Sequence, residues 1–215
     1  MALKKIYCLS GLGVDHRAFQ HLNLEGFEMV HIPWVKPLKG ESLQSYSKRL
    51  FETVDLPQNY ILIGVSFGGM VAQEFAKIQS PKQLFLISTI RNFHELPLKF
   101  KLAKVLNLHQ LLPISILKSA NFYTNYLFGV HQKKHKRLLK EILKDTDPYF
   151  LRWALQAILH WKNNQQVSGY RIHGDRDRIL KAISPNLLIK EGGHFMIVTK
   201  AKEVEQGIKR TLTFS

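Results

Sequence analysis

The sequence contains a single cysteine, no long hydrophobic run and only about half as many acidic as basic residues. Cys8 has no second cysteine with which to form an intrachain disulfide, so a reducing cytoplasm is the expected compartment. The longest apolar runs hold about six residues, whereas a membrane-spanning helix needs roughly 20, so no membrane span is expected. Residues 1–8 carry two lysines and lead directly into a strand-like run, so no signal peptide is expected either.

Signatures of bound nucleotides and metals are also missing. Gly11 and Gly13 are followed by no third glycine, which argues against a dinucleotide-binding loop, and no phosphate-binding loop or zinc-ligand spacing occurs. His131 and His135 are four residues apart, but the basic residues around them indicate a solvated helix face rather than a metal site. The sequence therefore predicts neither a cofactor nor a metal.

The charge is strongly positive and unevenly distributed. The chain has 31 Lys and Arg against 16 Asp and Glu, and residues 91–165 alone hold 13 basic against 4 acidic side chains. Such a segment can attract nucleic acid, anionic lipid or an acidic substrate, or it can simply form a solvated surface. No helix-turn-helix, RNA-recognition or zinc-finger pattern accompanies it, so nucleic acid is a disfavoured partner.

Short apolar runs alternate with amphipathic segments along much of the 215 residues. Helices are expected between the runs and after the last of them, and a short helix is expected after Asp15 as N-cap. Strands that alternate with helices form a parallel sheet covered on both faces, and ligands bind beyond the carboxyl ends of such strands. The expected strands are 3–9, 27–32, 60–64, 83–88, 167–172 and 186–190, and the expected helices are 43–55, 68–78 and 195–211.

The alternation pauses between residues 92 and 165, where no strand is expected. We therefore divide the chain into an α/β core of residues 1–91 and 166–215 and a helical insert of residues 92–165, within one folding unit. Four amphipathic helices are expected in the insert, over 97–109, 113–128, 131–144 and 148–162.

The most informative stretch surrounds Ser66. An apolar run ends at Gly64, Ser66 follows within Gly64-x-Ser66-x-Gly68, and a helical pattern begins directly afterwards. This is the strand, tight turn and helix of a nucleophile elbow, which lifts one serine side chain clear of the sheet. A Cβ at either glycine would collide with the opposing strand or helix, which explains why glycines flank the serine.

Two further motifs follow later strands at the same expected edge of the sheet. Asp177 lies in a loop after the fifth strand, and His194 lies after the sixth. A serine hydroxyl needs a base to take its proton, and a histidine base needs a carboxylate to set its tautomer and stabilise the imidazolium. Asp175 competes with Asp177 for the acid role, and His173 is interpreted as a brace for the loop.

Together these motifs resemble the α/β-hydrolase family. Residues 64–69 resemble its nucleophile elbow, 173–177 its acid loop and 192–195 its histidine loop, while 10–13 lie where that family has its oxyanion loop. The resemblance covers residues 3–213 and implies an α/β fold of the α/β-hydrolase type. Its mostly parallel sheet is expected to be trimmed to about six strands, because the first two strands of the family are missing, with helices on both faces and a helical cap insert.

The resemblance also implies an oxyanion hole made by the backbone N–H groups of Leu12 and Phe67. Ser10 stands where the family usually has histidine, which is tolerable because the hole needs backbone groups. The remaining candidates for the substrate pocket are Gly11, His16, Arg17 and Ser88.

The resulting prediction is a serine hydrolase that cleaves a carboxylic ester or thioester, with Ser66 as nucleophile, His194 as base and Asp177 as acid. The expected partner is a small acyl substrate, which the basic insert allows to be anionic. Two alternatives stay open: a lyase or acyltransferase of the same fold acting on an acidic metabolite or coenzyme A thioester, and a non-catalytic binding protein that uses its basic insert. The sequence leaves the oligomeric state and the acyl chain length open.

Overall fold

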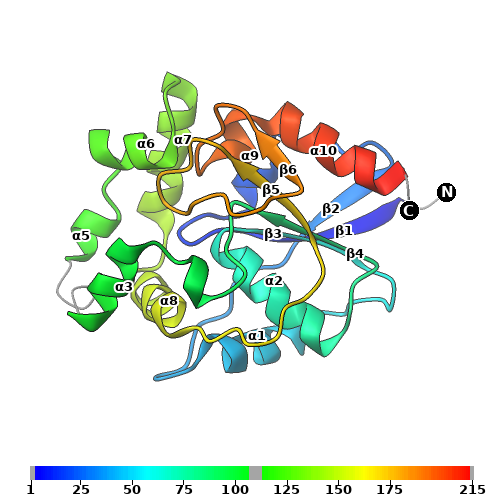
Figure 1. Ribbon diagram of the computed structural model, residues 1–215, viewed down its shortest axis with the longest axis horizontal. Coiled ribbons are helices and arrows are strands. Elements are labelled where there is room, and N and C mark those ends of the chain that lie inside the picture. Colours follow the sequence, from blue (N-terminus) through cyan, green and yellow to red (C-terminus); the bar gives the residue numbers. More distant parts are fainter. Residues whose placement is uncertain (1–2, 107–112, 214–215) are drawn as a thin grey trace.

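The computed structural model describes residues 3–106 and 113–213, and its centre is a six-stranded sheet (Figure 1). The strands lie in the order β2-β1-β3-β4-β5-β6, and all five neighbouring pairs are parallel. This confirms the predicted parallel sheet of about six strands. The strands are β1 (Lys4–Leu9), β2 (Phe27–His31), β3 (Ile61–Val65), β4 (Gln83–Ile87), β5 (Tyr170–Gly174) and β6 (Leu187–Ile189).

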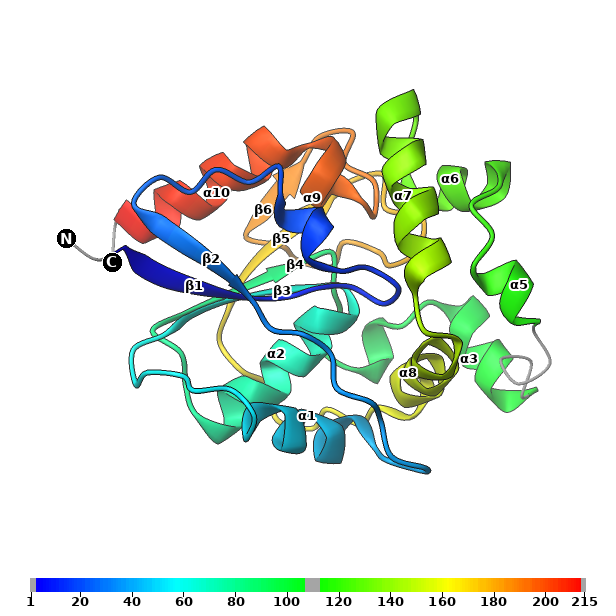
Figure 2. The same ribbon diagram turned by 180° about the vertical axis from the view of Figure 1, so that it is seen from behind.

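Helices cover both faces of the sheet, as Figures 1 and 2 show. Alternate strand residues face opposite layers, because successive side chains of a strand point to opposite sides. Leu62 and Leu84 pack on the layer of α1 (Leu43–Phe51) and α2 (Phe67–Ile78), whereas Ile63 packs on the opposite layer. The opposite layer holds η1 (His16–Phe19), α9 (Met196–Thr199) and α10 (Ala201–Thr213).

The segment between β4 and β5 is helical, as expected. Its elements are η2 (Phe93–Glu95), α3 (Leu98–Val105), α5 (Ile114–Leu117), α6 (Phe122–Phe128), α7 (Lys133–Asp145) and α8 (Pro148–His160). Figures 1 and 2 place these helices at the end of the sheet opposite the two chain termini.

Several predicted helix boundaries were wrong. The helix expected over 113–128 is two helices, because Asn121 caps a new one by accepting the N–H of Thr124. Part of the helix expected over 97–109 lies outside the described residues. The closing helix is interrupted at Lys200, whose φ of −132° and ψ of 36° are not helical.

The N-cap expected at Asp15 is confirmed, because its carboxylate accepts the N–H of Arg17 at the start of η1. At α8, Asp147 is the N-cap and Pro148 lies in the first turn. The predicted start of β5 was wrong: the strand begins three residues later than expected, because its pairing with β4 starts at Tyr170. Within residues 3–106 and 113–213, no helix is long and apolar enough to cross a bilayer.

Candidate active site

Ser66 lies in a strained turn between β3 and α2. Its φ of 53° and ψ of −116° are unusual for a residue with a side chain, and such strain concentrates at functional sites. Close packing explains the flanking glycines. A Cβ on Gly64 would come within 2.7 Å of the Ala72 Cβ on α2, and one on Gly68 would collide with the carbonyl oxygen of Leu9 at the end of β1.

Hydrogen bonds from neighbouring elements hold the Ser66 backbone in this conformation. Its N–H donates to the carbonyl of Ile87 at 2.9 Å, at the end of β4. Its carbonyl accepts the Thr89 hydroxyl at 2.6 Å and the Gly69 N–H at 3.0 Å. The strained turn is therefore anchored on the strand beside it, so the hydroxyl of Ser66 projects from a rigid support.

His194, in the loop after β6, contacts both Ser66 and Asp177. Its Nε2 lies 2.9 Å from Ser66 Oγ, and its Nδ1 lies 2.8 Å from Asp177 Oδ2. Because the carboxylate can only accept, Nδ1 carries the proton and Nε2 is free to accept the serine hydroxyl. The Phe128 ring packs edge-on against the imidazole at 5.6 Å between centroids.

The side chain of Asp177 is fully buried and accepts four hydrogen bonds. Oδ1 takes the N–H groups of Ile179 and Leu180 at 2.8 and 2.9 Å, and Oδ2 lies near His194 and His173. Burial alone would raise the pKa of Asp177, but the charge of His194 and the bonds from both histidines hold it well below its usual range. The carboxylate is therefore ionised.

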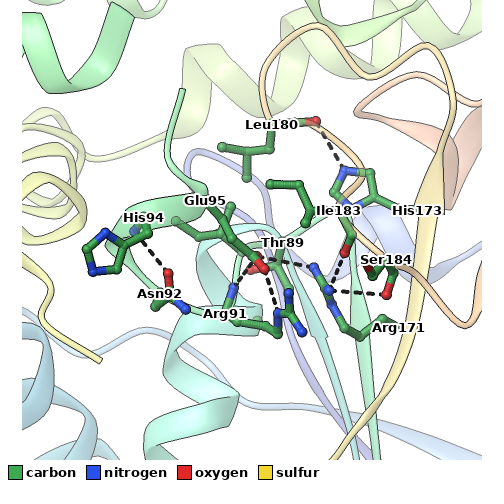
Figure 3. Close-up of polar contacts among 12 residues, drawn as sticks. Thr89, Arg91, Asn92, His94, Glu95, Arg171, His173, Leu180, Ile183 and Ser184 are labelled. Carbon is green, nitrogen blue, oxygen red and sulfur yellow. Dashed lines mark hydrogen bonds and ion pairs between the residues drawn. The ribbon is translucent and has the colours of Figure 1, made fainter. Parts of the chain in front are cut away.

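Asp175, the competing acid, is exposed, and its N–H donates to the carbonyl of Ile189. His173 is buried beneath the loop. Its Nε2 lies 3.1 Å from both Asp177 Oδ2 and the carbonyl of Leu180, the second contact being visible in Figure 3. Both partners are acceptors, so Nε2 carries the proton and His173 joins the acid to the far end of its own loop.

The loop after β1 runs directly beside the serine. A Cβ on Gly11 would lie 3.4 Å from the Ser66 Cβ, so the backbone approaches the nucleophile closely there. Gly11 accepts the N–H of Val14, and Gly13 has φ of 70°, as a tight turn with its third residue in the left-handed region requires. Phe67 opens α2, and the first N–H groups of a helix have no partner within it.

A cavity of about 440 Å³ opens beside Ser66 and His194. Gly11, a candidate for the substrate pocket, lines it, and so do Leu12 and side chains from the insert and the acid loop. Its walls are almost entirely apolar. Among the described residues that line it, the ionisable side chains are those of Lys99 and His194. The insert contributes Leu96, Phe100, Leu127, Phe128, Leu143, Leu151, Leu155, Ile158 and Leu159.

Three sequence candidates do not line this cavity in the described part of the chain. Arg17 is held away by ion pairs with Asp15 at 2.6 Å and Asp145 at 2.8 Å, which tie η1 to the end of α7. His16 is exposed and lies beside His31. Ser88, directly after β4, is fully buried, and its N–H donates to the carbonyl of Ile172 on β5.

Comparisons with known proteins agree with this architecture. No protein-family model and no curated protein matches the chain. Its structure is similar to a hydrolase from Oleispira antarctica (16% identity, TM-score 0.73, 100% of this chain and 93% of that one). A lipase-esterase related protein from Clostridium acetobutylicum is similar at 19% identity and TM-score 0.73, over 96% and 93% of the two chains. An esterase from Exiguobacterium antarcticum is similar at 12% identity and TM-score 0.68, over 98% and 92%.

The chain has the α/β-hydrolase fold. In this fold the loops after the parallel strands meet at one edge of the sheet, and Ser66, Asp177 and His194 follow β3, β5 and β6 there. Among the described residues, no three His, Cys, Asp or Glu side chains form a group that could hold a metal ion.

Sequence reasoning missed a buried ionic network that supports this α/β-hydrolase site (Figure 3). Glu95 accepts the Arg91 Nε at 2.5 Å and an Arg171 guanidinium nitrogen at 3.2 Å. Arg171 also donates to the carbonyls of Ile183 and Ser184 in the chain after the acid loop. The network thus ties the first residues of the insert to β5 and to the segment leading to β6.

One signal in the sequence could have pointed to this network. Arg171 interrupts a strand that was expected to be covered on both faces, and a charge in such a position needs a partner. Burial lowers the pKa of Arg171, the nearby Glu95 carboxylate raises it, and Arg91 lowers it, so the guanidinium depends on Glu95 for compensation. The identity of the partner was not readable, because Glu95 lies 76 residues away in the chain.

Proposed function

We propose that this protein is a serine hydrolase that cleaves a carboxylic ester or thioester through an acyl-enzyme. The observation that carries the proposal is the continuous contact from Ser66 Oγ through His194 to Asp177, with polar separations of 2.9 and 2.8 Å, beside an apolar cavity. Each group has the chemistry that its step requires, and the acid is ionised and buried.

In the first half of the reaction Ser66 Oγ attacks the substrate carbonyl carbon and His194 Nε2 takes the hydroxyl proton. The negative charge then moves to the carbonyl oxygen, where the N–H groups of Leu12 and Phe67 stabilise it. When the tetrahedral intermediate collapses, His194 returns its proton to the departing alcohol or thiol, and the acyl group remains on Ser66. Asp177 stabilises the imidazolium throughout.

In the second half water repeats these steps. His194 takes a proton from the water, the hydroxide attacks the acyl carbon, and the proton returns to Ser66 Oγ as the carboxylic acid leaves. The walls of the cavity favour an apolar acyl chain, since each buried methylene contributes up to about 0.8 kcal/mol. They offer little to an acidic metabolite, because the described side chains that line the cavity are apolar apart from those of Ser66, Lys99 and His194.

The test is labelling and turnover in matched serine variants. A fluorophosphonate probe should label the wild-type chain at Ser66, and Ser66→Ala should lose labelling and at least about 10⁴-fold in kcat for p-nitrophenyl esters. Ser88→Ala, which removes a buried hydroxyl outside the cavity, should retain both. Activity should rise from acetate to medium-chain esters, by about fourfold for each added methylene until the cavity is full.

Esterase activity that persists in Ser66→Ala would contradict the proposal. Labelling of Ser66 without turnover of any ester or thioester would instead favour the acyltransferase or lyase alternative, which a panel of acyl acceptors would then separate.

A further inference from the structure

Helix α3 has an apolar stripe that faces solvent. Leu98, Leu102, Val105 and Leu106 recur at the spacing that places side chains on one face of a helix. Their exposed fractions are 69%, 51%, 75% and 59%, whereas the stripe of an ordinary surface helix faces the core. Isolated exposed apolar residues need no explanation, but a complete stripe marks an interaction surface.

The lysines of the same helix turn toward the protein. Lys101 Nζ donates to the carbonyl of His94 at 3.0 Å, and Lys104 Nζ lies 4.8 Å from the centre of the Phe93 ring. Lys99 Nζ donates to the acid loop at the carbonyl of Arg178. These contacts fix the rotation of α3 about its axis, so its apolar side is outermost.

Two neighbouring helices extend the apolar surface. Figures 1 and 2 both show α5 between α3 and α6 along the end of the molecule that lies opposite the chain termini. Ile116 on α5 is 56% exposed, and Phe122 on α6 is 86% exposed. We define the outer face as a set of exposed apolar residues on α3, at its C-cap, on α5 and at the start of α6: Leu98, Leu102, Val105, Leu106, Ile116, Phe122 and Tyr123.

Positive charge flanks the outer face. Helix α7 stands beside α6 in both views and has exposed basic residues on its solvent side. Of these, Arg137 pairs with Glu141 at 2.9 Å, but the basic residues of α7 exceed its two acidic ones. The exposed basic residues of α7 are Lys133, Lys134, Lys136, Arg137, Lys140 and Lys144.

We propose that the outer face docks on an anionic lipid bilayer. Exposed Leu, Val, Ile and Phe side chains beside a basic helix are the combination that holds a protein at a lipid interface, through apolar burial and attraction to acidic headgroups. A second copy of the chain fits less well, because the formal net charge of +15 would be repeated across the interface.

Docking would bring the substrate cavity close to the lipid. Lys99 and Phe100 of α3 and Leu127 and Phe128 of α6 line that cavity, so two helices of the outer face also form its wall. This consequence rests on the proposed function: an ester with an apolar chain could pass from the bilayer into the cavity between them. The docking itself does not depend on the reaction.

The test is sedimentation of the full chain with vesicles of phosphatidylcholine alone and of phosphatidylcholine with an equal part of phosphatidylglycerol. The wild type should bind the anionic vesicles, and binding should weaken at about 0.5 M NaCl because salt screens the charges. Leu102→Glu with Val105→Glu should reduce the partition coefficient by at least about tenfold. Lys136→Gln with Lys140→Gln should reduce it by about fivefold for each lysine.

The matched control is Leu38→Glu with Leu188→Glu, two exposed leucines on the α/β core, which should bind as the wild type does. The outer-face, lysine and control variants should keep the far-UV circular dichroism spectrum and the melting temperature of the wild type, which verifies folding without reference to the reaction. Ser66→Ala should bind vesicles normally, so the docking inference and the proposed reaction can fail separately.

Three outcomes would overturn the inference. The wild type could bind neither kind of vesicle, or the control leucine variant could lose as much binding as the outer-face variant. Alternatively, the chain could be a dimer by analytical ultracentrifugation that Leu102→Glu with Val105→Glu converts to monomer, which would show that a second copy covers the face.

Discussion

Helices α2 and α3 differ in whether their apolar side chains are buried or exposed to solvent. In α2, every residue from Phe67 to Ala76 is buried, and the helix packs on the sheet that positions Ser66. In α3, the apolar stripe faces water while its lysines contact the protein. Burying one Leu or Val side chain contributes about 1.5–3 kcal/mol to folding stability. The buried residues of α2 provide this contribution, and the exposed residues of α3 do not.

This difference separates two tasks. The core must hold reacting atoms within a few tenths of an ångström, which requires dense packing and satisfied hydrogen bonds. The insert shapes the cavity and presents a surface, and surfaces that bind partners sacrifice stability. The following predictions test that division, from the largest expected effect to the smallest.

If the core carries the chemistry, changing its buried acid should have the largest effect. Asp177→Asn should lower kcat by about 10⁴-fold, because an amide no longer holds the required His194 tautomer. Steady-state ester hydrolysis measures this. Asp175→Asn is the matched control, since that carboxylate is exposed, and equal losses in the two variants would contradict the assignment of the acid.

Ion pairs should differ between the buried junction of the two regions, where Glu95 of the insert meets Arg171 of the core, and the exposed surface of α7. Glu95→Gln should lower the free energy of unfolding by about 3 kcal/mol, because the buried Arg171 charge loses its compensation. Glu141→Gln on α7 removes an exposed pair with Arg137 and should cost less than about 0.5 kcal/mol. Urea titrations of both variants would measure the free energy of unfolding. An unchanged value in Glu95→Gln would show that the network does not depend on charge.

Two histidines offer a comparison by pH. Burial lowers the pKa of His31 in the core, with help from the charge of His16, and burial also lowers the pKa of His135 on α7, with help from Lys134. In the unfolded chain both histidines have a pKa of about 6.5, so below that pH the unfolded state binds more protons than the folded state. The free energy of unfolding should therefore be insensitive to these histidines above about pH 6.5 and decline as the pH falls below it.

Urea unfolding at several pH values between neutral and mildly acid conditions would measure this slope. His31→Asn and His135→Asn should each remove part of it. A slope that neither variant changes would mean that other groups, such as Asp177 at much lower pH, carry the acid sensitivity.

Much of the core was predictable because its signals are local. Gly64 and Gly68 allow a crowded turn that few other residues could form, and the apolar run before them has the length of a buried strand. Asp15 and Ser42 cap η1 and α1 through bonds that reach only two or three residues along the chain. Such features depend on neighbours in the sequence, so they can be predicted without knowledge of the fold.

The site expectations that failed concern distant contacts. Arg17 was a pocket candidate, but Asp145, 128 residues away, holds its guanidinium elsewhere. Ser88 follows a strand, as Ser66 does, but it is fully buried and does not line the cavity beside Ser66. Neither outcome can be read from spacing, because both depend on which elements pack together.

By itself, the sequence determined the order of the strands and helices and the three loops that hold Ser66, Asp177 and His194, because turn residues and apolar periodicity act over short distances. Only the tertiary structure decided that Glu95 meets Arg171 and that the apolar side of α3 faces outward. An amphipathic pattern specifies two faces of a helix, but the contacts made by its neighbours decide which face meets solvent.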